Sequence, residues 1–285
     1  MTDLLMQGTP GAEQEIRRDP AFGLVPISPL RSLFGRLFAK INALAIAYEV
    51  NGIDVSKWNG PMDWQIAASR RLRFGYFRGG FGTNTKDAQV DNNRANCKLD
   101  AWGLYWFFYA GSTDPIAAAD GFYAVWKEGP GDLYPLGDFE YTTLDKIGTA
   151  NWIYKCANRF QDRSGVEEPF YTSPGWWNAH VAVNTWAKDH KLVVAHWTTL
   201  ASPTLPYDWS RYAKLWWMWQ HSANGNNLGV YYGAPAPPAA DADMDLDRYY
   251  GTLAQFQAEF GVASLTLDQR VKRLEDAALT HGWVL

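Results

Sequence analysis

Two carboxylates close the apolar, aromatic run Tyr134-Pro135-Leu136-Gly137-Asp138-Phe139-Glu140-Tyr141. In an extended strand successive side chains point to opposite faces, so Asp138 and Glu140 are predicted to share one face while Phe139 takes the other. Two neighbouring carboxylates cannot both ionise freely, and their pKa values tend to separate into one acid and one base or stabiliser. Such a pair of carboxylates is typical of the active site of a glycosidase. A strand end with two solvated acids is the alternative interpretation, and the rest of the chain has to decide between them.

Short apolar runs recur on both sides of this stretch, and each has the length of a β-strand. They lie at 52–55, 74–78, 104–109, 136–140, 169–172, 192–197 and 215–220. Helix-length stretches separate several of them, at 87–101, 115–127 and 149–163. Strands that alternate with helices predict a parallel sheet covered by helices, and this many repeats predict a closed barrel. We therefore expect an α/β fold, an irregular TIM-like (β/α) barrel with fewer than eight helices.

The strand ends of such a barrel are where chemistry is expected, because catalytic side chains lie at the C-terminal ends of the strands. Asp54, Asp138 and Glu140 all fall at strand ends of this kind. The stretch 224–242, rich in Gly, Pro, Asn and Ala, is predicted to be a long loop before the last barrel segment.

An N-terminal extension, residues 1–49, precedes the predicted barrel domain, residues 50–251. Its first part is expected to be irregular because of prolines at positions 10, 20, 26 and 29. An amphipathic helix is predicted next from the apolar positions Leu30, Leu33, Phe34, Leu37, Phe38, Ile41, Leu44 and Ala45. Docking of this apolar stripe on the main domain is the simpler interpretation, and a membrane-surface or wall-facing role is the alternative.

A C-terminal extension, residues 252–285, is predicted to form two helices. Capping boxes mark their starts, at Thr252 to Gln255 and at Thr266 to Gln269. The second helix carries apolar residues spaced four, three and four apart, at Leu267, Val271, Leu274 and Ala278. So short a seam leaves open packing on the barrel, self-association or attachment to a virion.

Charge and cysteine content exclude several classes of function. The net charge is −4 and the Lys and Arg residues are scattered, so nucleic acid is not expected as a partner. Cys97 and Cys156 are too few for a disulfide framework, lack metal-ligand spacing and are interpreted as buried thiols. We expect no secretory signal and no transmembrane segment, because no run has the required pattern or length.

Aromatic residues are frequent, with 15 Trp, 15 Tyr and 14 Phe, and this favours a carbohydrate ligand. Flat aromatic faces stack on the apolar faces of sugar rings, but large aromatics also fill protein cores. Composition alone therefore moves the prediction toward sugars only modestly.

Several motifs follow one another in order along residues 50–251. They are Gly52-Ile53-Asp54-Val55-Ser56-Lys57-Trp58-Asn59-Gly60 with Asp63-Trp64, Asp87, Asn93, Trp102-Gly103-Leu104-Tyr105-Trp106-Phe107, Asp138-Phe139-Glu140, Tyr171-Thr172, Trp197, Trp219-Gln220 and Met244-Asp245-Leu246-Asp247-Arg248-Tyr249-Tyr250-Gly251. This series resembles the lysozymes of glycoside hydrolase family 25, the N-acetylmuramidases common among bacteriophage endolysins. The chain departs from the family at Asn59, Trp106 and Asp247, where Gln, His and Asn are more usual, and at Arg78-Gly79-Gly80-Phe81-Gly82.

The acids receive distinct expected roles. Glu140 is expected to be the general acid, with a pKa raised by Asp138 and by an aromatic lining, while Asp138 stays ionised. The resemblance implies retention of configuration, by attack of the substrate's own 2-acetamido oxygen with Asp138 orienting it, and direct attack by a carboxylate is the alternative. Asp54 and Asp245, on the first and last strands, become neighbours when a barrel closes and are expected to complete a ring of acids. A strand-end cap for Asp54 and a solvated loop for Asp245 remain the other interpretations.

Five further residues are candidate contacts to the sugar: Tyr105, Tyr171, Trp197, Trp219 and Gln220. An aromatic residue in a barrel strand is a core residue at least as often, and Gln220 could equally bond the backbone. The histidines show no ligand spacing and no Ser/His/Asp set is evident, so no metal and no other cofactor are expected.

The expected function is that of a muramidase, cleaving the β-1,4 bond between N-acetylmuramic acid and N-acetylglucosamine in peptidoglycan. A non-catalytic wall-binding or virion component is the alternative, although a pure binding module has no need of an acid pair. A chitinase-type glycosidase is disfavoured, because the positions two and four before Asp138 carry Leu136 and Tyr134 rather than acids. We expect a phage-encoded enzyme, released from the host cytoplasm or carried on the virion, that acts at the bacterial cell wall.

Overall fold

The computed structural model describes residues 16–19, 23–26, 50–223, 228–237 and 243–262. Contacts divide the chain into two units, Met1–Ala47 and Tyr48–Leu285, and each is described by itself. The domain boundaries expected from the sequence stay a prediction.

A short hairpin is the described part of the first unit. Strand β1 (Ile16–Asp19) pairs antiparallel with β2 (Gly23–Pro26). The expectation that this part is irregular is wrong at these residues, since Pro26 stands at the end of a strand, where a missing N–H is tolerated. The helix predicted between residues 30 and 45 lies outside the described residues.

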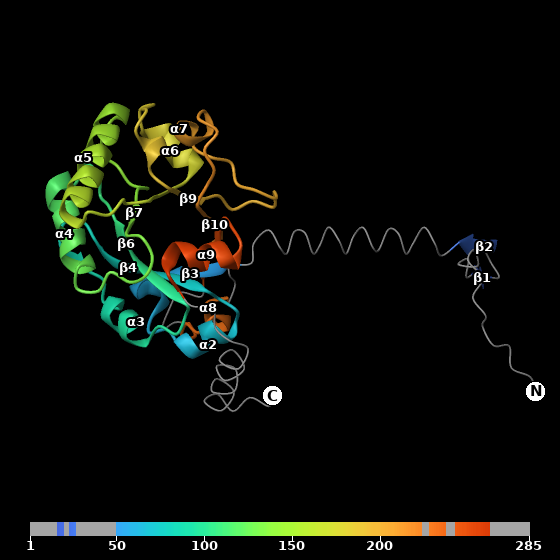
Figure 1. Cartoon of the computed structure of the whole chain (residues 1–285). Helices are drawn as coiled ribbons and strands as arrows, with labels where there is room; N and C mark the ends of the chain where they lie inside the picture. Colours follow the sequence, from blue (N-terminus) through green and yellow to red (C-terminus); the bar gives the residue numbers. More distant parts are fainter. Residues whose placement is uncertain (1–15, 20–22, 27–49, 224–227, 238–242, 263–285) are drawn as a thin grey trace, which may run out of the picture. The chain divides into compact units, whose positions relative to one another are not determined.

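Eight strands of the second unit close into a barrel (Figure 1), which confirms the predicted fold class. They are β3 (Asn51–Val55), β4 (Phe74–Phe81), β6 (Ala101–Phe107), β7 (Leu136–Asp138), β8 (Phe170–Thr172), β9 (Leu192–Ala195), β10 (Met218–Ser222) and β11 (Asp245–Tyr249). Their order around the sheet is β3-β11-β10-β9-β8-β7-β6-β4, and parallel pairing of β3 with β4 closes the ring. The two-residue strand β5 (Thr85–Lys86) pairs antiparallel with the end of β4.

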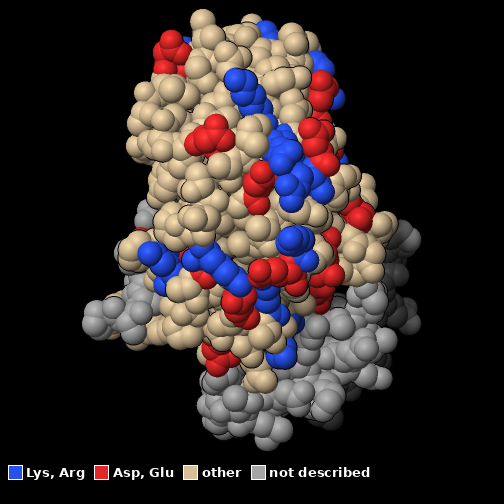
Figure 2. All heavy atoms as spheres, turned by 90° about the vertical axis from the view of Figure 1, so that its left-hand side faces the viewer, with Lys and Arg blue, Asp and Glu red and all other residues tan. Residues whose placement is uncertain are grey.

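Seven α-helices lie between barrel strands in the described part of the chain, which agrees with the expectation of fewer than eight. They are α2 (Trp64–Ser69), α3 (Val90–Asn96), α4 (Pro115–Trp126), α5 (Lys146–Ser164), α6 (Pro174–His180), α7 (Tyr207–Ser210) and α8 (Leu228–Tyr231). The two longest, α4 and α5, lie side by side on one outer face of the barrel (Figure 1). Figure 2 shows acidic and basic side chains intermingled on that side of the molecule.

Within the described ranges, no helix combines the length and the apolar character that a bilayer crossing requires.

Strand β11 runs antiparallel to both of its neighbours, β10 and β3, whereas the sequence predicted a parallel sheet. A parallel return needs a crossover that carries the chain back along the barrel, usually through a helix. The described part of the β10–β11 connection contains only the one-turn helix α8, so the chain enters β11 from the rim at which β10 ends. The first residues of β11 therefore lie at the same rim as the C-terminal ends of the other barrel strands.

Side-chain caps explain where the two long helices begin. Asp114 precedes α4 and its Oδ1 accepts the amide N–H of Ala117 at 2.9 Å. Asp145 does the same for α5, accepting from Gly148 at 2.6 Å, so this helix starts three residues before the predicted position 149. Gly165 ends α5 with a φ of 70°, a conformation that glycine adopts without steric cost.

Phe139 anchors the segment that carries the acid pair. Its side chain is 1% exposed and stacks on Phe108, with ring centroids 5.1 Å apart. The ring of Phe170 meets it edge-on at 4.9 Å. The backbone N–H of Phe139 donates to the carbonyl of Tyr171, and Phe108 donates to the carbonyl of Asp138. Phe139 therefore points into the layer between sheet and helices, away from the barrel interior, as the strand alternation predicted.

Helix α9 (Leu253–Phe260) packs on the end of the barrel opposite to the rim that carries Asp54 and Asp138. Its start is the predicted capping box, in which Thr252 and Gln255 bond reciprocally. Phe256 is fully buried against Phe74, the first residue of β4, and Tyr249, the last of β11. The second predicted C-terminal helix, from residue 266, lies outside the described residues.

Glu168, just before β8, is a fully buried acid that the sequence did not single out. Its side chain is 0% exposed, and neither carboxyl oxygen has a hydrogen-bond partner among the described residues. Gly137 leaves room for it, because a Cβ at that position would lie 2.9 Å from Glu168 Cδ. Burial raises the pKa of Glu168 well above its ordinary value, so the folded protein holds this side chain as a neutral acid.

Replacing Phe139 by Ala should destabilise the barrel by about 3 to 5 kcal/mol, because it removes a buried ring from a close-packed cluster. Urea unfolding followed by far-UV circular dichroism measures the loss. Ile147→Ala is the matched control, since Ile147 is 66% exposed and its truncation should cost less than about 0.5 kcal/mol. Equal losses for the two variants would contradict the anchoring role of Phe139.

Glu168→Gln should make stability less dependent on pH. The raised pKa of Glu168 in the folded state means that its contribution is fully present below its unfolded value of 4.5 and is lost as the pH rises above it. The wild type should therefore lose more unfolding free energy than the variant between pH 4 and pH 8, as measured by denaturant titration at each pH. Identical pH slopes for the two proteins would show that Glu168 is ionised in the fold.

Candidate active site

The four acids predicted from the sequence lie together at one rim of the barrel. Asp54 stands near the end of β3 and Asp138 is the last residue of β7. Asp245 begins β11 and is the direct register partner of Asp54, so closure of the barrel makes them neighbours as expected. Glu140 follows β7 by two residues, and all four line one cavity.

The cavity opens at this rim and has a volume of about 220 Å³. Enclosed small-molecule pockets are usually larger, roughly 300 to 1,000 Å³, so this site suits part of a longer chain rather than a whole enclosed ligand. Its lining consists of the residues Asp54, Ser56, Trp58, Tyr76, Arg78, Tyr105, Phe107, Leu136, Asp138, Glu140, Tyr171, Val193, Met218, Gln220, Asp245 and Asp247. Five of these are carboxylic acids, and Arg78 is the single cation among the described lining residues.

A hydrogen-bonded chain holds Asp54 in place. The Nε2 of Gln220 donates to Asp54 Oδ2 at 2.9 Å. The Oε1 of the same amide accepts from the hydroxyl of Tyr171 at 2.9 Å and from the indole N–H of Trp197 at 3.2 Å. Gln220 thus links β10 to β3, to β8 and to the segment after β9, and the hydrogen bonds of its side chain go to side chains rather than to the backbone.

Burial and mutual repulsion raise the pKa of the acids in this cluster. Asp54 is raised to about 6, chiefly by burial, although hydrogen bonds from Gln220 and Asp247 and the charge of Arg78 act in the opposite direction. Asp245 is raised to about 8, by burial and then by the charges of Asp54 and Glu140. Because these groups interact strongly, their protons titrate as a set rather than one by one.

The acid pair itself differs from the expectation in one respect. Burial, followed by the charges of Glu140 and Asp54, raises the pKa of Asp138 well above its ordinary value, and its Oδ1 has no hydrogen-bond partner among the described residues. This environment favours the neutral form of Asp138, in contrast to the expectation that it stays ionised. Glu140 keeps an exposed edge at the cavity mouth, yet the surrounding protein and then the charge of Asp54 raise its pKa too.

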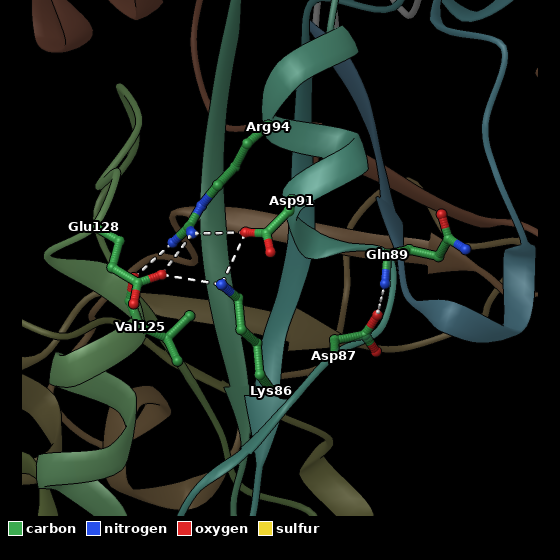
Figure 3. Close-up of polar contacts among 7 residues, drawn as sticks. All are labelled: Lys86, Asp87, Gln89, Asp91, Arg94, Val125 and Glu128. Carbon is green, nitrogen blue, oxygen red and sulfur yellow. Dashed lines mark hydrogen bonds and ion pairs between the residues drawn. The ribbon is translucent and has the colours of Figure 1, made fainter.

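Arg78 is held in the site by Asp87. Its Nε donates to Asp87 Oδ2 at 2.7 Å, and the side chain of Asp87 is almost fully buried. Asp87 also accepts the backbone N–H group of Lys57. It accepts that of Gln89 as well (Figure 3), and together these bonds fix its orientation. Asp87 belongs to the motifs that resemble the family, but the sequence predicted no role for either residue of this ion pair.

The segment around Asp87 is tied down by a surface ion-pair network (Figure 3). Lys86 lies 2.9 Å from Asp91 on α3 and 3.0 Å from Glu128 beyond α4. Arg94 joins the same two acids and donates to the carbonyl of Val125 at 2.6 Å. Exposed pairs of this kind each contribute at most about 1 kcal/mol, so their role is to join strand β5 to the neighbouring helices.

The candidate sugar contacts divide into three groups. Tyr105, Tyr171 and Gln220 line the cavity. Trp197 is 64% exposed beside it and reaches the site through its bond to Gln220. Trp219 is only 1% exposed, packs in the core and donates to the carbonyl of His196, so the structure places it away from the cavity lining.

Among the lining residues that the sequence did not predict, Trp58, Arg78 and Asp247 bear a charge or an exposed aromatic ring. Trp58 is 58% exposed and lines the cavity, although it was quoted only as part of the first motif. Arg78 and Asp247 stand where the chain departs from the family pattern, and the sequence predicted no role in the site for either. A signal for Asp247 was available, because Asp245 and Asp247 stand two apart in a strand and therefore point to the same face.

Within the described ranges, no group of three or more His, Cys, Asp or Glu side chains is arranged to hold a metal ion.

Fold and site together define a barrel hydrolase with a carboxylate-lined cavity at the strand ends. The sequence model described as "Glycosyl hydrolases family 25" matches residues 53–230. This match spans more than half of the chain, so the chain belongs to glycosyl hydrolases family 25 and is a glycosidase of the lysozyme type.

Individual relatives agree with this assignment. The chain is 28% identical to Lysozyme M1 of Streptomyces globisporus over 222 residues, which cover 73% of this chain and 70% of the relative. It is 25% identical to the N,O-diacetylmuramidase of Arthroderma benhamiae over 183 residues, which cover 60% of this chain and 77% of the relative. The crystal structure of a bacterial lysozyme from Streptomyces coelicolor superposes with a TM-score of 0.61 and 26% identity, covering 74% of this chain and 96% of that one.

Arg78→Met should move the lower-pH limb of activity to higher pH. Arg78 lowers the pKa of both Asp54 and Asp138, so its removal makes their ionisation harder. The pH profile of kcat/KM on soluble wall fragments measures the displacement. Lys57→Met is the matched control, because Lys57 is an exposed cation that does not line the cavity. The same displacement in both variants would mean that general surface charge is responsible.

Proposed function

We propose that this glycosidase cleaves the β-1,4 bond between N-acetylmuramic acid and N-acetylglucosamine in bacterial peptidoglycan, and that it serves cell-wall lysis. The observation that carries the proposal is the cavity at the strand ends, where five carboxylic acids and one arginine surround an opening. Relatives named lysozyme and N,O-diacetylmuramidase support the choice of peptidoglycan over other polysaccharides.

Glu140 is assigned the role of general acid. Its side chain lines the cavity and is exposed to solvent, whereas Asp138 is buried. Its raised pKa keeps a proton available for the glycosidic oxygen. A single exposed, protonated acid is what bond cleavage requires on the leaving-group side.

Asp138 is assigned the role of stabilising the sugar ring on which positive charge develops. Positive charge that develops on the ring favours the ionised form of a nearby carboxyl, so Asp138 gives up its proton to solvent through the open mouth of the cavity as the reaction proceeds. We propose that it then orients the 2-acetamido group of the substrate, whose oxygen attacks the anomeric carbon, and that configuration is retained. Direct attack by the carboxylate is the competing route.

Asp54 and Asp245 are assigned to tuning rather than to bond breaking. The charge of Asp54 raises the pKa of Glu140, and both acids raise that of Asp138. Tyr105, Tyr171 and Gln220 are assigned to the bound sugar from their positions in the lining, and Trp58 offers an exposed aromatic face for stacking at the mouth.

We further propose that the protein is phage-encoded and acts at the bacterial wall, either after release from the host cytoplasm or from the virion. The terminal segments are proposed as sites of self-association or virion attachment, on the strength of the apolar spacing between Leu267 and Ala278. Immunoblotting of purified virions distinguishes the two routes, because only a virion-borne enzyme co-purifies with the particles.

Glu140→Gln should lower turnover by about 10²- to 10⁴-fold while the fold is retained, because the amide has no proton to give. Release of reducing ends from purified wall measures turnover, and circular dichroism checks the fold. Glu128→Gln is the matched control, since Glu128 belongs to the outer ion-pair network and does not line the cavity. A fully active Glu140 variant would show that another group is the acid.

The bond cleaved is identified by borohydride reduction of the products of the wild-type enzyme. Muraminitol as the new reduced end is the expected result. Glucosaminitol or free stem peptides would contradict the proposed bond. Sedimentation of the protein with wall material without release of reducing ends would instead favour a non-catalytic wall-binding or virion component.

A further inference from the structure

Asp54 and Asp247 form a carboxyl–carboxyl pair inside the cavity. They come from the antiparallel neighbours β3 and β11, both line the cavity, and their side chains share a hydrogen bond. Asp247 is only 3% exposed. Two ionised carboxylates have acceptors only, so a hydrogen bond between them requires that one of them holds a proton.

The orientation of Gln220 shows which acid holds that proton. The indole N–H of Trp197 has no acceptor capacity, so the group of Gln220 that faces it is the carbonyl oxygen. The Nε2 of Gln220 must then face Asp54 Oδ2, where it donates at 2.9 Å. Asp54 thus accepts from Gln220 on one side, which favours its ionised form, and the proton of the pair belongs to Asp247.

The charges around the pair agree with this arrangement. Asp247 faces Asp54 on β3, Asp245 on its own strand and the hydroxyl-bearing Tyr76 on β4, and none of these is a cation. Burial raises the pKa of Asp247 well above its ordinary value, and the two aspartates add to the effect. Arg78, the cation of the cavity, acts instead on Asp54 and favours its charged form.

We propose that Asp247 is a positioning residue that works as a neutral acid, donating its proton in a hydrogen bond that keeps Asp54 ionised and aimed into the cavity. The kinetic consequence rests on the proposed function, because the charge of Asp54 supports the proton on Glu140. The state of the pair itself does not depend on any activity.

Two substitutions of Asp247 distinguish its protonated form from its ionised form, because each form predicts a different position for the acid limb of the pH profile of kcat/KM. Asp247→Asn keeps a donor and has no charge, so the limb set by Asp54 should stay in place. Asp247→Val has no donor, so ionisation of Asp54 becomes harder and the acid limb should move to higher pH. The value of kcat/KM at pH 6 should fall on the order of tenfold, which corresponds to the loss of one hydrogen bond to a charged group. Asp162→Asn is the matched control, an exposed acid on α5 that does not line the cavity, and should leave the profile unchanged.

Either of two kinetic results overturns the proposal. If Asp247 were ionised, Asp247→Asn would remove a neighbouring negative charge and move the acid limb to lower pH. An unmoved limb in Asp247→Val would show that Asp54 does not depend on the donor.

Carbon-13 NMR of the wild-type carboxyl groups gives a readout that needs neither activity nor a stable valine variant. The Asp247 resonance, assigned by its absence from the Asp247→Asn spectrum, should keep the chemical shift of a protonated carboxyl at pH 7. A shift typical of a carboxylate would overturn the proposal. Absence of muraminitol in the product assay would count against the proposed function and leave this result standing.

Discussion

Insertion of β11 between β10 and β3, with its direction reversed, is the constraint on which the site depends. The reversal turns the beginning of this strand toward the rim where the other barrel strands end, and it sets Asp245 opposite Asp54 in register. Asp247, two residues further along, then faces the same interior. A parallel last strand would have brought its C-terminal residues to that rim and taken both aspartates away from it. Three of the five cavity acids meet only because of this one strand pairing.

Concentrating five acids around one arginine has an electrostatic cost that the fold has to bear. Each additional negative charge raises the pKa of the others, and burial adds to this effect, so several of the acids hold protons near neutral pH. Two groups offset part of this cost. The amide of Gln220 donates a hydrogen bond to Asp54, and Arg78, held in place by Asp87, brings a positive charge to the cavity. A site in this state has protons to give at pH values where an isolated aspartate or glutamate would have none. That property fits the acid-assisted cleavage of a glycosidic bond.

Most of the aromatic richness serves packing rather than sugar binding. Trp106, Trp177, Trp209 and Trp219 are almost completely buried, in the layer between the sheet and the surrounding helices. The same layer holds Phe139, so the ring between the two acids of the motif is part of the main core. Packing of that ring gives the acid pair a rigid base. The aromatics that face the opening are fewer, and Trp58 and Trp197 stand out because more than half of each is exposed.

The sequence by itself determined the class of fold, the alternation around Asp138-Phe139-Glu140 and the approach of Asp54 to Asp245. These follow from local periodicity and from the order of strands in a closed barrel, both of which a single chain displays. Only the tertiary structure decided the direction of β11, the burial of Trp219 and the state of Asp138, because each depends on neighbours distant in sequence. Asp247 shows the limit most clearly. Its spacing from Asp245 is visible in the sequence, but its partnership with Asp54 arises only when β3 and β11 lie side by side and the amide of Gln220 is turned by Trp197.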